Sequence, residues 1–418
     1  MLRYRTLSLI RSDGPISRAE IARRLAVSKP SVSSVVRDLL ERGLIAEAGQ
    51  AHASIGRRAI ALALAADAAT VIGIDVGATS IRAASCDAAG RTLALMREPT
   101  QGHSEDTLID QLAGICAELR GRVPASRAPV AVAIGTPGVI DPESGGLRYA
   151  PNLPALERPG LADRIERALG LPVTLHNDVN LAALGEHWRG AGRHLRNFAF
   201  IGIGTGLGFG FVLNGELFTG TWGRAGEFSL TRVHPGRDRL VEDVVAGAGL
   251  ARNHRALGGS GRPEDAFAEH AAGIEPGTAV LEEFLECLAS VIAALTTILD
   301  PERIVLGGGI GMRLGPQLPE LRRRLARAAP FTSEVVLSEQ GDHAGLHGAL
   351  WSALWHYERR LLRELDTRDH AGAEALAVAS FRESMMRLGD AWSAAGEADA
   401  AGQPPLSEAL LPARAVAL

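Results

Sequence analysis

The stretch NFAFIGIGTGLGFGFVLNGELFTG (197–220) has the pattern of a strand, a glycine-rich turn and a returning strand. An earlier stretch, TVIGIDVGATSIRAASCDAAGRTLAL (70–95), has the same order. Strand and helix patterns alternate after each of these hairpins, which is typical of α/β proteins. The sequence therefore predicts an α/β body with two lobes, residues 70–190 and 191–360, that face one another across a cleft.

The turn of the first hairpin contains Asp75, Gly77 and Thr79. Gly77 lets backbone N–H groups approach a phosphate, Thr79 offers a hydroxyl, and Asp75 can hold a hydrated Mg²⁺. This pattern suits a nucleotide, although an ordinary hairpin explains it equally well.

Polar residues follow several other buried strand patterns. Asp178 ends the strand of PVTLHNDVNLAALGEH (172–187) beside Asn177, and YAPNLP (149–154) supplies Asn152. A carboxylate in this position fits a general base that orients a hydroxyl. The alternative is that Asp178 caps the helix that follows.

The stretch ISRAEIARRLAVSKPSVSSVVRDLLERGLI (16–45) predicts two short helices joined by a turn. Ser17 and Glu20 form a capping box at the start of the first helix, and Ser28 caps the second. Apolar residues spaced by three and four form a buried stripe on the second helix. That stripe comprises Val32, Val35, Val36, Leu39 and Leu40.

The opposite face of the second helix carries small hydroxyls and two cations, which suits entry into a DNA major groove. The strands predicted after it enclose a loop with two arginines, which indicates a wing. The predicted DNA-binding residues are Ser28, Lys29, Ser31, Ser33, Ser34, Arg37, Arg57 and Arg58. Residues 1–65 are thus predicted to be a winged helix-turn-helix domain, the alternative being a helical packing module with a solvated polar face.

Charge is distributed unevenly along the 418 residues. Residues 1–65 hold eleven Lys or Arg and five Asp or Glu, so this segment is positive although the chain carries a net charge of −4. A basic segment on an acidic body favours binding to a polyanion. Three scattered cysteines, no signal-peptide pattern and no membrane-length apolar run predict a cytoplasmic protein.

The order of short motifs resembles the ROK family (repressors, open reading frames, kinases). The motifs are DVGAT, GTPGVID, PNLP, HNDVN, GIGTGLGFG, AGE and LGGGIG, all after the helix-turn-helix pattern. The resemblance spans residues 1–355 and is strongest to the transcriptional regulators of the family. It implies an actin-like, ribonuclease-H-like body with two lobes.

The resemblance also assigns roles to particular residues. It implies a sugar site made by Asn152, Asn177, Asp178, Glu227 and Glu242, with Asp178 as the catalytic base if the protein is a kinase. It implies a nucleotide site made by Asp75, Gly77, Thr79, Gly204, Thr205, Gly206 and Gly308 if ATP binding is kept. Without the resemblance, a solvated acidic surface would explain the same carboxylates.

The sequence departs from the family pattern around Glu227. Leu230 stands where the family typically has a histidine, and RVHPGRDRLVE (232–242) lacks the family's cysteine cluster. Four nitrogen or sulfur ligands therefore cannot be assembled, so no structural zinc is expected and His234 is expected to be solvated.

Two functions of different classes follow. The first is a sugar-responsive transcriptional repressor that binds a palindromic operator as a homodimer or homotetramer, requires no cofactor and has no membrane partner. Its effector, a sugar or sugar phosphate, would bind in the cleft. The second is an ATP-dependent sugar kinase with an accessory DNA-binding head. For the Ala-rich extension 366–418, a packed helix and a partly disordered segment are both open.

Overall fold

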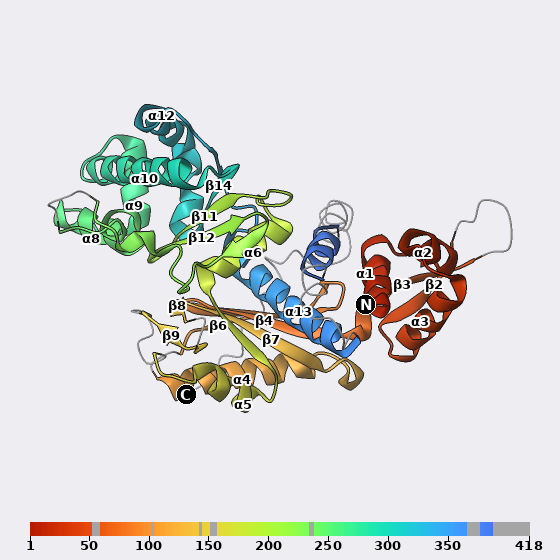
Figure 1. Cartoon of the computed structure of the whole chain (residues 1–418). Coiled ribbons are helices and arrows are strands. Elements are labelled where there is room, and N and C mark those ends of the chain that lie inside the picture. The colour runs from red at the N-terminus through yellow and green to blue at the C-terminus, as the bar shows by residue number, and fades with distance from the viewer. Residues whose placement is uncertain are drawn as a thin grey trace. The chain divides into compact units, whose positions relative to one another are not determined.

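The computed structural model describes residues 1–51, 59–101, 104–141, 144–150, 157–233, 238–365 and 377–387. It is an α/β protein, as the alternating strand and helix patterns predict (Figure 1). The chain divides into two compact units. The first unit comprises Met1–Ile134, Ala162–Leu175 and Ala349–Leu418, and the second comprises Gly135–Leu161 and His176–Gly348.

The N-terminal part of the first unit is the predicted winged helix-turn-helix domain. It consists of α1 (Leu2–Asp13), β1 (Ile16–Ser17), α2 (Arg18–Leu25), α3 (Lys29–Glu41), β2 (Ile45–Ala51) and β3 (Ala59–Leu64). Strand β3 pairs antiparallel with both β1 and β2. The tip of the wing, residues 52–58, lies outside the described residues.

Both predicted helix caps are present in this domain. The Ser17 hydroxyl accepts a hydrogen bond from the Glu20 N–H at 3.3 Å, and the Ser28 hydroxyl accepts one from the Ser31 N–H at 3.2 Å. Ala26 has a left-handed backbone (φ +54°) and ends α2. Local side-chain chemistry therefore sets where both helices begin, as the sequence indicates.

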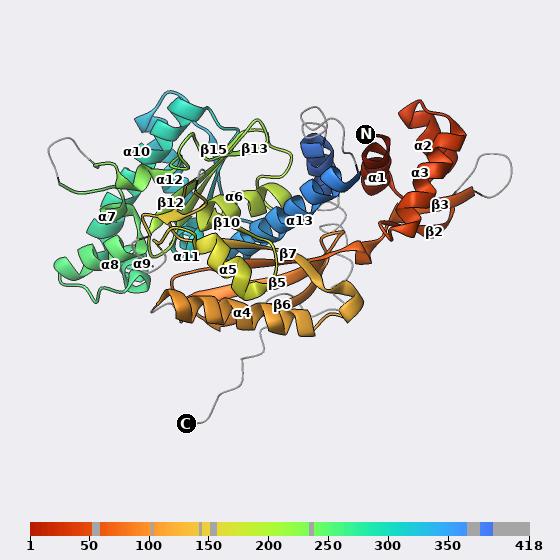
Figure 2. The ribbon, with the colours of Figure 1, turned by 60° about the horizontal axis from the view of Figure 1, so that its bottom comes forward.

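The rest of the first unit is built around a five-stranded sheet. Its strand order is β10 (Val173–Asn177), β7 (Pro129–Thr136), β4 (Thr70–Val76), β5 (Ser80–Asp87) and β6 (Thr92–Pro99). Helices α4 (Glu105–Gly121) and α5 (Leu161–Leu169) cover one face, and α13 (Ala344–Leu365) lies on the other (Figures 1 and 2). A Cβ at Gly73 would lie 2.6 Å from the Leu350 nitrogen, so glycine allows α13 to pack directly on β4.

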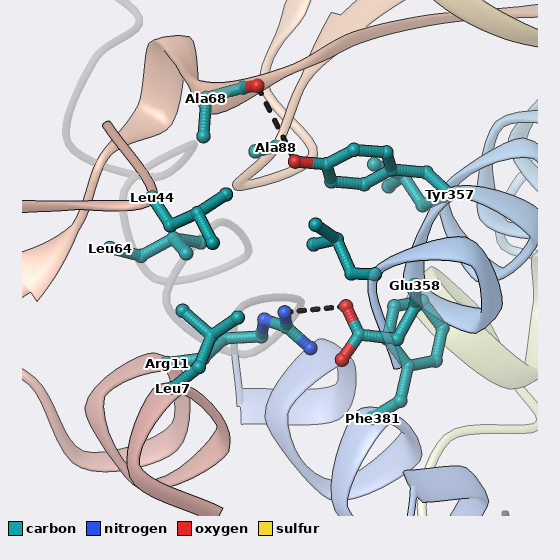
Figure 3. A pocket seen from close by; sticks show the side chains of 11 residues that line it. Leu7, Arg11, Leu44, Leu64, Ala68, Ala88, Tyr357, Glu358 and Phe381 are labelled. Carbon is teal, nitrogen blue, oxygen red and sulfur yellow. Dashed lines mark hydrogen bonds and ion pairs between the residues drawn. The ribbon is translucent and has the colours of Figure 1, made fainter. Parts of the chain in front are cut away.

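Helix α1 packs against α13 and against a further helix formed by residues 377–387. Arg11 of α1 donates a 2.5 Å hydrogen bond to Glu358 of α13, and both side chains are almost completely buried (Figure 3). The Arg11 guanidinium carbon also lies 5.8 Å from the ring centroid of Phe381. Part of the Ala-rich extension is therefore a helix packed on the body, while residues 388–418 lie outside the described residues.

The second unit contains a five-stranded sheet of its own. Its strand order is β13 (Glu216–Phe218), β12 (Leu207–Leu213), β11 (Phe198–Ile203), β14 (Arg303–Gly307) and β15 (Glu334–Leu337). Strands β11 and β12 pair antiparallel from Phe198↔Val212 to Ile203↔Leu207, which confirms the hairpin predicted over residues 197–220. The short strands β8 (Val139–Ile140) and β9 (Leu147–Arg148) form a separate ribbon.

Helices cover both faces of the second sheet. Phe198 and Phe200 of β11 pack with α6 (Asp178–Arg189), whereas the alternate residues Ala199 and Ile201 pack toward α10 (Gly277–Leu299). The remaining helices of this unit are α7 (Glu242–Val245), α8 (Gly247–Ala256), α9 (Pro263–Ala272), α11 (Gly308–Gly311) and α12 (Leu318–Ala328). Within the described part of the chain, no helix combines the length and the apolar character needed to cross a membrane.

The two units do not follow the lobe boundary predicted at residue 190. Helix α6, placed by the sequence in the first lobe, belongs to the second unit, and the winged domain belongs to the first unit. The reason is packing: Ala182 and Ala183 of α6 lie in one apolar cluster with Val212 of the second sheet. Gly210 makes this contact close, since a Cβ there would lie 2.8 Å from Ala183 Cβ.

Candidate functional site

Three predicted carboxylates meet in the second unit. Burial raises the pKa of Glu227 above its usual value, and the negative charges of Asp178 and Glu242 raise it further. These three side chains come from separate elements, namely a 3₁₀ helix (Glu227–Leu230), the start of α6 and the start of α7. The fold thus gathers into one acidic cluster residues that lie up to 64 positions apart in the sequence.

Asp178 and Asn177 occupy the junction between β10 and α6. The Asn177 side chain caps α6 by accepting a 3.0 Å hydrogen bond from the Asn180 N–H, and it donates another to the Gly138 carbonyl at 3.0 Å. Asn177, not Asp178, is therefore the helix cap. Asp178 accepts a hydrogen bond from the Val179 N–H at 2.9 Å, and the loss of water around its carboxylate raises its pKa to about 6.

Glycines set the positions of the other two carboxylates. Gly226 precedes Glu227 with φ +100°, and a Cβ there would lie 2.2 Å from the Phe209 carbonyl oxygen. Glu242 accepts a 3.2 Å hydrogen bond from the Leu207 N–H, and a Cβ at Gly206 would lie 2.8 Å from its carboxylate. The glycine-rich hairpin therefore orients Glu242.

A cavity of about 470 Å³ opens beside Glu227. All the side chains that line it belong to the second unit. They are Val139, Asp141, Arg148, Tyr149, Trp222, Arg224, Glu227 and Leu230. Its size lies within the range of about 300–1,000 Å³ found for small-molecule pockets.

Sequence reasoning identified Glu227 and Leu230 in this cavity and missed the aromatic and arginine residues. Tyr149 and Trp222 are large apolar side chains that remain 51% and 59% exposed. Their sequence signal is weak, because a single aromatic residue in a Gly-rich turn has no periodic pattern. Asn152 lies outside the described residues, so its sugar-binding role stays a prediction.

The predicted nucleotide residues are divided between the two units. In the first unit, Asp75 lies 3.8 Å from the Arg82 guanidinium, and the Gly77 N–H donates to the Ser80 carbonyl at 3.1 Å across the turn. Thr79 is exposed in this turn between β4 and β5. These contacts describe a closed, well-formed hairpin, and its use for phosphate binding stays a prediction.

In the second unit, the Gly204–Thr205–Gly206 turn joins β11 and β12. The first backbone N–H groups of α8 donate to its carbonyls, with Gly247 bonded to Gly204 at 2.8 Å and Ala248 to Thr205 at 3.0 Å. Gly308 begins α11 with φ +79°, and a Cβ there would lie 2.5 Å from the Ile203 carbonyl oxygen. The packing of the fold therefore accounts for both glycine-rich turns without any nucleotide.

Helix α3 presents the predicted DNA-binding face to solvent. Val32, Val36 and Leu39 are fully buried, with Val35 and Leu40 half-buried, so the predicted stripe faces inward. The opposite face is exposed at Ser28, Lys29, Ser31, Ser33, Ser34 and Arg37. Ser28 and Ser31 also contact each other through their hydroxyls at 2.7 Å, so Ser28 serves as a cap as well as a surface group. Arg57 and Arg58 lie outside the described residues.

The described ranges contain no candidate metal site. Over those residues, no group of three or more His, Cys, Asp or Glu side chains could hold a metal ion. The three cysteines are buried free thiols. His234 lies outside the described residues, and the expectation of a protein without structural zinc stays a prediction.

Comparisons with known proteins agree with this architecture. The ROK family model matches residues 71–356, so the chain belongs to the ROK family. A MarR family model matches residues 2–53, which cover the helices of the winged domain. The class of protein is therefore a ROK-family protein with an N-terminal winged helix-turn-helix domain.

Among its relatives, the chain is 26% identical to the N-acetylglucosamine repressor of Escherichia coli O157:H7, over 82% of this chain and 89% of that protein. It is 30% identical to a glucokinase of Halalkalibacterium halodurans, over 67% of this chain and 93% of the glucokinase. A crystal structure of a ROK family transcriptional regulator, described as a homologue of the E. coli MLC protein, shares the fold. The TM-score is 0.70 at 21% identity, over 93% of this chain and 98% of that one.

Proposed function

We propose that this protein is a sugar-responsive, DNA-binding transcriptional regulator that represses genes of carbohydrate uptake or catabolism. The observation that carries the proposal is the presence, in one chain, of an exposed recognition helix and a carboxylate-lined cavity. A repressor among the relatives, aligned over most of this chain, supports the same function.

The carboxylate cluster supplies the chemistry for binding a polyol. Asp178, Glu227 and Glu242 accept hydrogen bonds, and sugar hydroxyls donate them. Because buried polar groups without partners are costly, a ligand that satisfies these oxygens binds with high specificity. Of these three carboxylates, Glu227 lines the cavity, and Leu230 beside it gives the sugar an apolar contact in place of a further hydrogen bond.

On DNA, a dimer would place two copies of α3 in successive major grooves, about 10 base pairs apart or a multiple of that spacing. For nearly complete release of DNA, the sugar must favour the released form by about 10⁴-fold. We propose a homodimer or homotetramer on a palindromic operator, with no cofactor required.

The test is fluorescence anisotropy of the protein on DNA from upstream of its own gene, titrated with sugars and sugar phosphates. Glu227→Ala is expected to bind the DNA as wild type does and to lose release by sugar. Arg327→Ala, an exposed change in the second unit, is the matched control and should keep the response. A Glu227→Ala protein that is as sugar-sensitive as wild type would place the effector elsewhere.

Sugar phosphorylation is the second candidate, favoured by the environment of Asp178. A carboxylate with a pKa of about 6 is suited to act as a general base near neutral pH. The 30% identity to a glucokinase supports this candidate. The check is ADP release from Mg-ATP with each sugar of the panel; turnover that disappears in Asp178→Asn would establish the kinase function, and its absence in wild type would reject it.

A further inference from the structure

Two exposed aromatic side chains flank the cavity beside Glu227, and neither is needed for the core of the fold. Trp222 lies in the loop after β13, between Gly220 (φ +73°) and Gly223 (φ +71°). Tyr149 directly follows β9. Both line the cavity although they come from separate segments of the chain. Large apolar groups exposed at a cavity mark a binding surface, because exposure to water is unfavourable for them.

The backbone at Tyr149 adds a second observation. Tyr149 has φ +51°, in the left-handed region that bulky side chains rarely adopt. Such a conformation is unfavourable for a residue with a Cβ, and residues held in it are concentrated at functional sites. The fold therefore tolerates an unfavourable backbone that leaves a 51% exposed aromatic ring on the wall of the cavity.

Charges on the cavity wall are balanced. Arg148 forms a 2.6 Å ion pair with Asp141, and the wall also contains one further cation, Arg224, and one further carboxylate, Glu227. With Asp178 and Glu242 acting on Glu227 as well, the cavity has no excess of positive charge that would favour a phosphate. The guanidinium and carboxylate groups still provide donors and acceptors for neutral hydroxyls.

We propose that this cavity is a subsite for a second sugar ring, so that the effector is a neutral glycoside of at least two rings. One ring contacts the carboxylate cluster, and the next stacks its apolar face on Trp222 and Tyr149. Val139 and Leu230 provide further apolar wall, and the Arg148–Asp141 pair contacts the hydroxyls at the ring edge. This inference rests on the proposed function, because it concerns the same sugar site.

Isothermal titration calorimetry tests the proposal with matched ligands. The probes are glucose, xylose and N-acetylglucosamine, their β-1,4-linked disaccharides cellobiose, xylobiose and N,N′-diacetylchitobiose, and the 6-phosphates of glucose and N-acetylglucosamine. For the sugar that releases DNA, the disaccharide is expected to bind about tenfold more tightly than its monosaccharide, since stacking on an aromatic ring contributes on that order.

Variants of the exposed aromatic residues identify the subsite. Trp222→Ala and Tyr149→Ala are expected to remove the advantage of the disaccharide and to leave monosaccharide affinity unchanged. Trp222→Phe retains an aromatic face and should preserve the advantage. Trp222→Phe also isolates the emission of Trp222. Subtracting the spectrum of this variant from that of wild type leaves the Trp222 fluorescence, which the disaccharide should quench.

Three outcomes would overturn the proposal, and they are distinguishable. Equal affinity for monosaccharide and disaccharide, unchanged in Trp222→Ala, would reject the second-ring subsite and leave sugar sensing intact. Tighter binding of a 6-phosphate, lost in Arg224→Ala, would make the cavity an anion site instead. If no probe binds in a Glu227-dependent manner, the proposed sugar-sensing function itself is rejected, and the subsite with it.

Discussion

Asp178 carries a buried carboxylate that destabilises the fold when it is ionised. Its pKa is raised from 3.8 to about 6 because burial disfavours the charged form. The folded state therefore holds the proton more tightly than the unfolded chain. Such a carboxylate lowers the stability of the fold once it is ionised, which is the expected condition of a group kept for its chemistry.

The corresponding prediction is that Asp178→Asn stabilises the protein at pH 7.5. Between pH 4 and 6 the native state of wild type binds more protons at this site than the unfolded state, so wild-type stability falls as pH rises through that window. Above pH 6 the full penalty remains, on the order of 3 kcal/mol for a shift of this size. Denaturant unfolding at pH 7.5 and pH 4 should show the advantage of the variant at the higher pH and its disappearance at the lower.

The control for that experiment is the difference between the two proteins, because Glu227 and Glu186 also have raised pKa values that change wild-type stability with pH. Subtracting the wild-type curve from the Asp178→Asn curve removes the contribution of Glu186. The charge of Asp178 helps to raise the pKa of Glu227, so the difference reports Asp178 together with its coupling to Glu227. A variant that is less stable than wild type at both pH values would show that the ionised carboxylate makes favourable contacts that outweigh its desolvation.

At the scale of elements, the sequence predicts best what local chemistry determines. The two helices of the head follow from the caps at Ser17 and Ser28, and the hairpin over 197–220 follows from its glycines. Asn177 has a second role that the strand pattern does not predict: its amide caps α6 and donates to the Gly138 carbonyl. Its role as a sugar ligand stays a prediction. Tyr149 and Trp222 could not be predicted, because only tertiary folding brings their loops to one cavity.

The packing partners of the helix formed by residues 377–387 could not be predicted from the sequence either. Its amphipathic pattern is visible in the sequence, but its partners are α1 and α13, far away along the chain. Phe381 packs against Trp355 in a tilted arrangement with ring centroids 5.1 Å apart, and Arg387 pairs with Asp13 of α1. This helix thus links the DNA-binding head to the body within the first unit.

The buried Arg11–Glu358 pair is the most specific contact between α1 and α13 (Figure 3). Arg11→Met is expected to destabilise the protein by about 3–5 kcal/mol, because it leaves the Glu358 carboxylate buried without its partner. The double variant Arg11→Met plus Glu358→Met should recover most of that loss, since two apolar groups replace both charges. Thermal unfolding of wild type, both single variants and the double variant forms the cycle.

The result separates two roles for the pair. If the double variant is as unstable as Arg11→Met, packing in this interface depends on the shape of the two side chains more than on their charges. If the double variant is stable and still binds DNA, the pair is not required to orient the head.

Positive charge is concentrated in the N-terminal domain, and the rest of the chain is negatively charged. A chain with net charge −4 concentrates eleven cations in residues 1–65, and Lys29 and Arg37 of α3 are exposed there. DNA binding releases about one counterion for each phosphate that a cation neutralises, so the affinity falls steeply with salt. The remainder of the chain has a net negative charge, which disfavours contact with DNA, so we expect binding to be confined to the head.

This charge distribution predicts how much each exposed cation contributes to the salt dependence of DNA affinity. In fluorescence anisotropy from 50 to 200 mM salt, Arg57→Ala plus Arg58→Ala should weaken binding to all DNA sequences alike and reduce the slope of log K against log salt by about 2. Lys29→Ala should reduce it by about 1, with a larger loss on operator than on random DNA if Lys29 contacts a base. Arg327→Ala, an exposed arginine outside the head, should leave the slope unchanged.

A slope that falls equally in the Arg327 variant would mean that the second unit also contacts DNA. An unchanged slope in the double variant would remove the wing from the DNA interface.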